Sequence, residues 1–200
     1  IGAGASGSIL ASILVKQGWR VGLLHQESRS VDWPELLSPE AVLGLEQCDL
    51  QATILDCGGR NCRGVMEWHA EEPTVRDFEL FHTGPGYFVS RRSFARAVRE
   101  EAGRAGAQIL TYDRTVGYQQ DVNPTTIAVS ELNSRARFVV EASGTRPSVP
   151  GVPRDRRHFD TSIGICMELR GVDLPPDFLH LLMLDSGWAY MISQSGGTAM

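Results

Sequence analysis

The sequence is poor in lysine and lacks long apolar runs. Lys16 is the only lysine among its 19 basic residues, and the arginines form no stripe or cluster of the kind that binds nucleic acid, so no nucleic-acid partner is expected. The formal net charge of -5 is mildly acidic. No apolar run is long enough to cross a bilayer and no signal peptide is visible, which together favour a cytoplasmic protein without a membrane span.

Paired cysteines of the kind that bind zinc are also missing. The four cysteines are Cys48, Cys57, Cys62 and Cys166, and their spacing includes no C-x-x-C pair, so we predict no metal site. Four free thiols in a reducing compartment are the expected state. A disulfide between Cys57 and Cys62 remains the alternative.

The two ends of the 200-residue chain both resemble interrupted elements. A β-strand should precede the first glycine, but only Ile1 is left of it. Residues 195–200 are typical of a turn that leads into another strand. We therefore expect a segment of a longer protein, holding one domain or a domain and a half.

A glycine-rich turn opens the chain. Gly2, Gly4 and Gly7, with Ala5 and Ser6 between the last two, form a G-x-G-x-x-G pattern followed by an apolar helix pattern. The first glycine permits a tight turn, the second lets backbone approach a pyrophosphate, and the third lets the helix pack against the sheet. The helix N-terminus offers N–H groups to phosphates. The pattern predicts a dinucleotide, FAD or NAD(P); a turn without a ligand is the alternative.

The acidic residue that usually binds the ribose is displaced. Gly18 should end the first helix, and residues 21–24 should form the second strand. The ribose-binding acid normally ends that strand, roughly 20 residues beyond the glycines, and His25 occupies this place. Gln26 and Glu27 follow directly. All three are candidates for binding the ribose, and a plain surface histidine is the alternative for His25.

The stretch 28–81 is too long for a simple loop. We predict one short helix in it, over residues 39–50, and interpret the remainder as an insertion that caps or lines a substrate site. Trp68 is a candidate substrate contact there. His69 and His82 are candidate acid–base groups, although each could equally be an ordinary loop histidine.

The order of the expected helices and strands along the chain indicates an α/β fold with a Rossmann-like βαβ unit, a β-meander and a mixed-sheet substrate domain. We predict a FAD-binding domain over 1–28 and 83–150, and substrate-domain segments over 29–82 and 151–200. An amphipathic helix should place Phe94, Ala97 and Val98 in the core and Arg99 in solvent. The expected strands cover residues 87–90, 109–112, 115–119, 126–130, 136–140, 163–169, 181–184 and 188–192.

Three motifs in this order resemble one family. They are the glycine turn, the V-S-R-R-S-F element at 89–94 with A-G-A at 105–107, and V-V-E-A-S-G-T-R-P-S at 139–148. Together they resemble the flavoprotein monooxygenase superfamily with the para-hydroxybenzoate hydroxylase fold, which includes flavin-dependent halogenases and geranylgeranyl reductases. A fourth element, D-S-G-W-A-Y-M-I at 185–192, resembles the halogenase-like branch.

The resemblance implies an FAD cofactor and further contacts to it. Arg91 matches the family arginine that reaches the phosphate or ribose side of the cofactor, with Arg92 as the rival if the register slips by one. Ser143 and Gly144 match the tight turn beside FAD. Trp188 and Tyr190 match the strand that borders the flavin in the halogenase-like branch, which makes them substrate-side candidates; packing of one strand face is the alternative.

Two departures from the family narrow the expected chemistry. Halogenation relies on a lysine between the nucleotide unit and the Arg91 element, and this chain has none there, so a halogenase is disfavoured. Ser143 replaces the usual aspartate, which weakens the case for direct nicotinamide binding and leaves room for a separate flavin reductase. The second FAD motif of the family would lie beyond Met200.

The resemblance therefore implies an FAD-dependent monooxygenase that hydroxylates an aromatic substrate through a flavin C4a-hydroperoxide. The substrate is an aromatic small molecule, an indole for example, or a tryptophan in a peptide or protein, as in the flavoproteins that help to build a tryptophylquinone cofactor. Two alternatives stay open: a geranylgeranyl-reductase-like flavin reductase, and a flavin-binding maturation scaffold without turnover.

Overall fold

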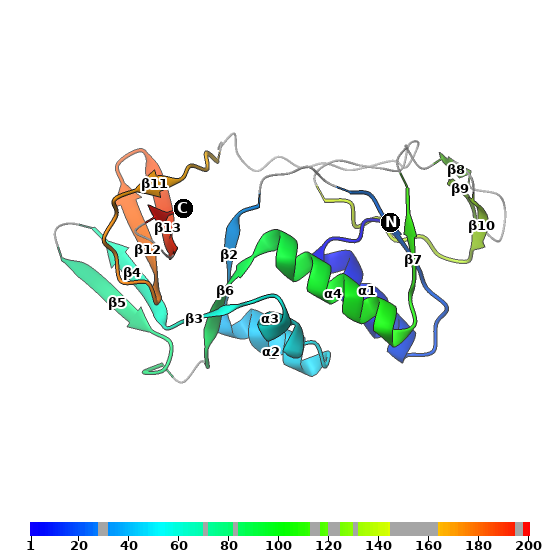
Figure 1. The fold of residues 1–200 in the computed structure, drawn as a ribbon, viewed down its shortest axis with the longest axis horizontal. Helices are drawn as coiled ribbons and strands as arrows, with labels where there is room; N and C mark the ends of the chain where they lie inside the picture. Colours follow the sequence, from blue (N-terminus) through cyan, green and yellow to red (C-terminus); the bar gives the residue numbers. More distant parts are fainter. Residues whose placement is uncertain are drawn as a thin grey trace. The chain divides into compact units, whose positions relative to one another are not determined.

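The computed structural model describes residues 1–27, 32–69, 72–81, 84–112, 117–119, 125–129, 132–144, 164–194 and 198–200. The chain divides into two compact units (Figure 1). The first comprises Ile1–Val31 and Ala95–Thr161, and the second comprises Asp32–Phe94 and Ser162–Met200. The predicted division into a FAD-binding and a substrate domain stays a prediction, and the boundary expected after residue 150 lies outside the described residues.

The first unit is built around a parallel strand pair. Strand β1 (Gly22–His25) pairs in parallel with β7 (Gln108–Thr111). On the other side of β1, the Gly2 N–H donates to the Leu24 carbonyl at 3.0 Å. The Ala142 N–H donates in turn to the Ile1 carbonyl at 2.7 Å. The first two residues thus continue the ladder between β1 and the segment that ends at Ala142, as a βαβ unit requires.

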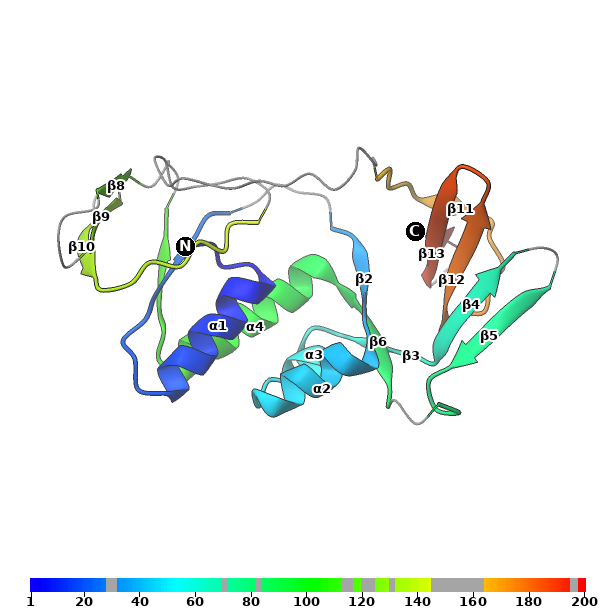
Figure 2. The same ribbon diagram turned by 180° about the vertical axis from the view of Figure 1, so that it is seen from behind.

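Two helices accompany these strands. Helix α1 (Ala5–Lys16) follows the glycine turn, and α4 (Arg91–Ala105) leads into β7. The two helices lie side by side (Figure 2). Small side chains permit this close packing, because Ala11 of α1 and Ala102 of α4 share one buried cluster with Ala3 and Leu23. The predicted buried face of α4 is confirmed, since Phe94, Ala97, Val98 and Ala102 are all buried.

The predicted meander is present with a shifted third strand. Strands β8 (Gly117–Gln119), β9 (Thr125–Val129) and β10 (Leu132–Ala136) form an antiparallel sheet in the order β10-β9-β8. The third strand was expected at 136–140, with a turn at Asn133 and Ser134. Asn133 and Ser134 instead pair with β9 as part of β10. The apolar run after Ala136 therefore did not indicate the position of this strand.

The second unit begins with a small antiparallel sheet. Strand β6 (Gly86–Ser90) is its centre, flanked by β2 (Pro34–Leu37) and β3 (Arg60–Cys62). Helices α2 (Pro39–Gln47) and α3 (Ala52–Asp56) connect β2 to β3. Ser38 begins α2 by accepting a hydrogen bond from the Ala41 N–H, and Pro39 follows in the first turn, where proline is tolerated.

A six-stranded sheet completes the second unit, in the order β11-β14-β13-β12-β4-β5. Its core packs against the small sheet through a buried cluster of Cys62, Phe88 and Ile192. Most pairs are antiparallel, and β4 pairs with β12 in parallel. The strands are β4 (Gly64–Trp68), β5 (Pro73–Asp77), β11 (Leu169–Arg170), β12 (Phe178–Leu184), β13 (Gly187–Gln194) and β14 (Thr198–Ala199).

The structure adds regular elements to the stretch 28–81, for which only a helix over residues 39–50 was predicted. Its described residues contain four strands and two helices, so most of the stretch is sheet and helix rather than a loop. The strand expected at 163–169 is also wrong, because residues 164–168 have no regular structure and only Leu169 begins a strand. The four cysteines are all free thiols, and none of the described helices is long and apolar enough to cross a membrane.

Candidate functional site

The glycine turn combines two crowded positions with one open position. A Cβ on Gly2 would lie 2.5 Å from the carbonyl carbon of Ala142, and the Gly2 φ of +99° also disfavours any side chain. A Cβ on Gly7 would overlap the Gly2 carbonyl oxygen. Gly4, in contrast, is exposed, and a Cβ there would meet no atom within 4 Å. Packing within the chain therefore requires Gly2 and Gly7 to be glycines, but it does not require Gly4.

Among the described residues, no side chain caps the first turn of α1. Its N-cap residue is Gly4, which has no side chain to accept a hydrogen bond, and the turn contains no acidic residue. The N–H groups that begin an α-helix need an acceptor from elsewhere, and the positive end of the helix dipole favours an anion. Ala5 and Ser6 lie in this turn, with Ser6 exposed. The arrangement offers a place for a phosphate group.

His25 ends β1, where the ribose-binding acid would be expected. Burial lowers the pKa of His25, the charge of Arg99 lowers it further, and Glu27 opposes both. The neutral imidazole is therefore favoured, and it can donate or accept one hydrogen bond at each nitrogen. Gln26 and Glu27 are exposed beyond the strand.

Arg99 is a residue that the sequence pattern placed wrongly. It falls on the polar side of α4 by helical spacing, yet it is half-buried, and its Nη1 donates a long hydrogen bond of 3.4 Å to the Ala3 carbonyl in the glycine turn. Its charge also acts on His25. The contacts of Arg99 with the glycine turn and with His25 are visible only in the fold, where α4 lies beside the turn. Helical periodicity distinguishes the polar face of a helix from its apolar face, but it does not show which residues contact the polar face.

The segment that ends at Gly144 packs against the glycine turn. The Ser143 hydroxyl donates to the carboxylate of Glu141, and Gly144 has a φ of +75°, typical of a turn residue without a side chain. The approach of Gly2 to Ala142 and Ser143 brings the first and third family motifs together. Ser143 thus lies beside the glycine turn, and the contact of Ser143 and Gly144 with FAD stays a prediction.

Arg91 lies in the second unit, at the start of α4. The Nε atom of its exposed side chain lies 3.4 Å from the carboxylate of Glu35 on β2. The backbone N–H of Arg91 donates a hydrogen bond to the Trp33 carbonyl at 2.9 Å. A surface ion pair of this kind contributes little stability, so the side chain can exchange partners at small cost. The proposed cofactor contact of Arg91 stays a prediction, as does the alternative at Arg92.

Trp68 on β4 is held by a buried histidine that the sequence did not single out. The Trp68 Nε1–H donates to His180 Nδ1 at 3.3 Å, and His180 Nε2 lies 2.9 Å from the Pro175 carbonyl. His180 is fully buried, so this pair of contacts fixes the ring with Nε2 protonated. The indole N–H of Trp68 is therefore already occupied.

Trp188 and Tyr190 form an exposed aromatic stack on β13. Their ring centroids lie 5.8 Å apart with an interplanar angle of 19°, and the residues are 63% and 43% exposed. Tyr190 pairs with Leu181, which pairs with Glu67 on β4, so Glu67 shares this face of the sheet. The His69 Nε2 lies 3.8 Å from the Glu67 carboxylate. The structure thus brings His69 toward this aromatic face; His82 lies outside the described residues.

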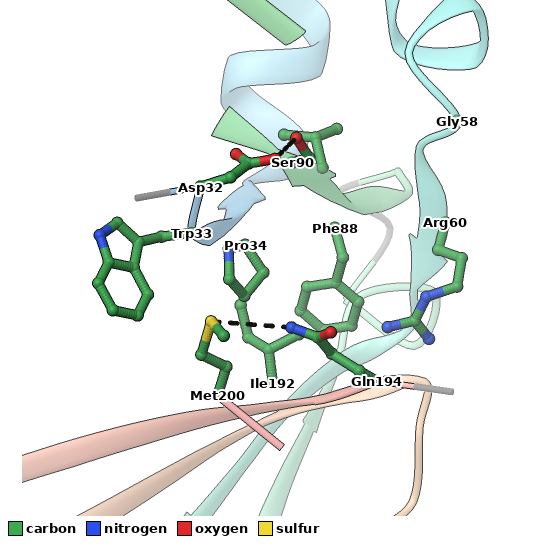
Figure 3. A pocket seen from close by; sticks show the side chains of 11 residues that line it. Asp32, Trp33, Pro34, Gly58, Arg60, Phe88, Ser90, Ile192, Gln194 and Met200 are labelled. Atoms are coloured by element: carbon green, nitrogen blue, oxygen red, sulfur yellow. Dashed lines mark hydrogen bonds between the residues drawn. The ribbon is translucent and has the colours of Figure 1, made fainter. Parts of the chain in front are cut away.

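A cavity of about 320 Å³ lies within the second unit (Figure 3). Trp33, Pro34 and Phe88 supply an aromatic and apolar wall from the small sheet, and Ile192 and Gln194 come from β13. Sequence reasoning expected the stretch 28–81 to line a substrate site but proposed none of these residues as a contact, because the strands that carry them meet only in the fold. The remaining lining residues are Asp32, Gly58, Arg60, Val89, Ser90 and Met200.

No family model and no curated protein sequence matches the chain. Solved structures of flavin enzymes do match its fold, over 99% of the chain. One is QhpG, a peptidyl tryptophan dihydroxylase essential for tryptophylquinone cofactor biogenesis, with 20% identity and a TM-score of 0.69. Another is PqsL of Pseudomonas aeruginosa, a probable FAD-dependent monooxygenase solved with 2-aminobenzoylacetate, with 22% identity and a TM-score of 0.72.

A third match is the myxobacterial chondrochloren halogenase CndH, a variant of the FAD-dependent halogenases, with 23% identity and a TM-score of 0.73. The chain spans about half of the length of these proteins: 43% of QhpG, 57% of PqsL and 50% of CndH. At these identities the likeness concerns the fold. The predicted α/β fold is confirmed, and it is similar to the fold of these FAD-dependent enzymes.

Proposed function

We propose that the chain is part of an FAD-dependent monooxygenase that hydroxylates an aromatic substrate. The main structural support for the FAD site in this proposal is the open space beside Gly4. Two glycines of the turn are explained by packing against the chain itself, whereas Gly4 has free space beside an uncapped helix N-terminus. A pyrophosphate explains both features, because backbone must approach it closely and the N–H groups must bond to it.

The residues around the turn fit the rest of a dinucleotide. The pyrophosphate would lie against Gly4, Ala5 and Ser6, with Gly2 and Gly7 shaping the turn. His25, Gln26 and Glu27 would bind the adenosine ribose, and the lowered pKa of His25, which favours the neutral ring, supports a hydroxyl partner. The remaining proposed contacts to FAD come from Arg91, Ser143 and Gly144.

The protein's part in the reaction is to bind and orient, while the flavin, when bound, supplies the redox chemistry with O₂. The aromatic face with Trp188 and Tyr190 and the cavity beside Trp33 and Phe88 both suit a planar substrate. His69, beside Glu67, is the described candidate for moving a substrate proton. The absence of lysine over residues 28–90 continues to disfavour halogenation.

Oxygen consumption coupled to product formation tests the proposal. The FAD-loaded protein is supplied with a chemical or enzymatic reductant, with O₂ and with aromatic candidates, both small molecules and tryptophan-containing peptides. We expect bound flavin, and a product that gains oxygen from O₂ as shown by mass spectrometry with isotopic O₂. Flavin binding without oxygen transfer to any candidate points to the reductase or scaffold alternative, and failure to bind FAD contradicts the proposal at its root.

A further inference from the structure

The cavity of the second unit has two kinds of wall. In Figure 3, Trp33 lies at one end and Arg60 at the other, with Pro34 and Phe88 between them. Phe88 is buried, and Ile192 continues the apolar surface from β13. A volume of about 320 Å³ is in the range of small-ligand sites and suits a substituted aromatic ring. The shape and the walls therefore favour a planar ligand.

Two charged residues line this cavity, and the negative one is already compensated. Asp32 accepts a hydrogen bond from the Ser90 hydroxyl at 2.7 Å and another from the Arg92 N–H at 2.9 Å. The Arg92 N–H belongs to the first turn of α4, so the Asp32 carboxylate faces the positive end of that helix. Asp32 thus serves as a cap for α4, with both of its oxygens engaged.

The positive residue has no such compensation. The Arg60 guanidinium donates to the carbonyls of Pro176 at 3.1 Å and Ser193 at 2.6 Å. It also lies 5.3 Å from the centre of the Phe88 ring, where the ring attracts a cation. Neutral carbonyls fix the guanidinium in place but do not cancel its charge. Among the described residues, no carboxylate lies within ion-pair distance of Arg60.

We propose that this cavity binds an aromatic molecule carrying an anionic group such as a carboxylate, and that Arg60 recognises this group. The identification of this ligand with the substrate rests on the proposed function; the binding itself does not. A fixed guanidinium with unused N–H groups matches a carboxylate in shape and charge, and Trp33 and Phe88 contact the ring. A free aromatic acid satisfies both requirements, whereas the side chain of a peptide tryptophan carries no anionic group.

Paired probes of equal size test the inference. Binding of 2-aminobenzoate and 2-aminobenzamide to the protein with FAD is measured by calorimetry at low and high salt. We expect the acid to bind about tenfold or more tightly than the amide, with only the acid weakened by salt. Equal affinities, a preference for the amide, or no binding of either probe would overturn the proposal. Capture of a tryptophan peptide in competition with the acid would instead assign the cavity to peptides.

Variants locate the recognition at Arg60. Arg60→Gln should abolish the preference for the acid and retain weak binding of the amide, and Arg60→Lys should restore part of the preference. Arg170→Gln is the matched control, because Arg170 lies in the same unit, is exposed and lies 3.6 Å from the carboxylate of Glu168. A preference that survives Arg60→Gln contradicts the assignment. The flavin absorbance, recorded on the same samples, reports separately whether the proposed function holds.

Discussion

Trp68 and Trp188 lie on opposite faces of one sheet. Trp68 pairs with Leu182, and Leu182 pairs with Ala189, the residue next to Trp188 on β13. Paired residues share a face and neighbours on a strand alternate, so the two indoles point in opposite directions. They therefore cannot line one pocket on one face, although the sequence marks both as substrate-side candidates. Trp68 belongs with His180, and Trp188 belongs with Tyr190.

The Trp68–His180 contact predicts a large stability effect. His180→Ala removes a fully buried ring and leaves the Trp68 N–H and the Pro175 carbonyl without their partner. We expect a loss of about 2–4 kcal/mol in the free energy of unfolding, measured by urea denaturation. His69→Ala is the control, because its side chain is 61% exposed and its loss should cost about 0.5 kcal/mol or less. Equal effects of the two changes would contradict the buried contact.

The Arg63–Asp77 pair predicts a pH-dependent contribution to stability. Burial raises the pKa of Asp77, but hydrogen bonds from Arg63 at 2.6 Å and from the N–H groups of Leu80 and Glu79 outweigh this and lower the pKa overall. Because the folded-state pKa is lowered, the contribution is complete above the unfolded-state pKa of about 3.9 and disappears as the pH falls through the folded value.

The stability difference between wild type and Asp77→Asn checks this sign. We expect the wild type to be more stable at neutral pH and the difference to shrink as the pH falls below about 4. Glu168→Gln on the exposed pair with Arg170 serves as the control. A difference that does not depend on pH speaks against an ionised Asp77 in this pair.

The proximity of Arg99 to His25 predicts a measurable change in a histidine pKa. The pKa of His25 is lowered by burial and by the Arg99 charge, so Arg99→Gln should raise it toward the usual value of about 6.5. Arg96→Gln on the same helix, where Arg96 is exposed and 3.8 Å from Glu100, should leave it unchanged. The measurement is an NMR titration of the His25 ring. An unchanged pKa in Arg99→Gln would show that the two groups are not close.

The crowding at Gly2 predicts a stability loss that does not depend on a ligand. Gly2→Ala combines a φ of +99° with a Cβ 2.5 Å from Ala142, and should destabilise the protein without cofactor by about 1–3 kcal/mol. Gly44→Ala, in the middle of α2 with no atom within 4 Å of its Cβ, should instead stabilise by about 0.5–1 kcal/mol. Thermal unfolding without added FAD separates the two. A neutral Gly2→Ala would disprove the close approach.

The sequence predicted the parts of the fold that depend on local pattern. The glycine turn, the apolar face of α4 and the strands expected at 181–184 and 188–192 were visible because spacing along the chain determines each of them. The strands of the region 28–81 were missed, because they are short and the partner of β4 is the distant β12, while β2 and β3 pair with β6, so their pairing leaves no local signal. The strand expected at 136–140 was misplaced, because the apolar residues there pack against the buried cluster that contains Ile1, and the chain then hydrogen-bonds to the Ile1 backbone.

The candidate site was predictable only where a motif marks it. The glycines and Ser143 carry such a motif, and the fold brings them together. Arg60, Arg99 and His180 carry none. Each is important through a partner more than 90 residues away in the sequence, and no spacing rule indicates such a partner.

The affinity of Gly4→Ala for FAD tests the central claim most directly. The Gly4 Cβ would have no atom of the described residues within 4 Å, so the variant should fold with a stability loss of less than about 1 kcal/mol. A pyrophosphate in the turn would, however, meet the added methyl group. The account predicts that FAD binding, measured by titration of flavin fluorescence, weakens by about tenfold or more while the melting temperature without FAD barely changes. Unchanged FAD affinity in a folded Gly4→Ala variant would contradict the assignment of this turn to the cofactor.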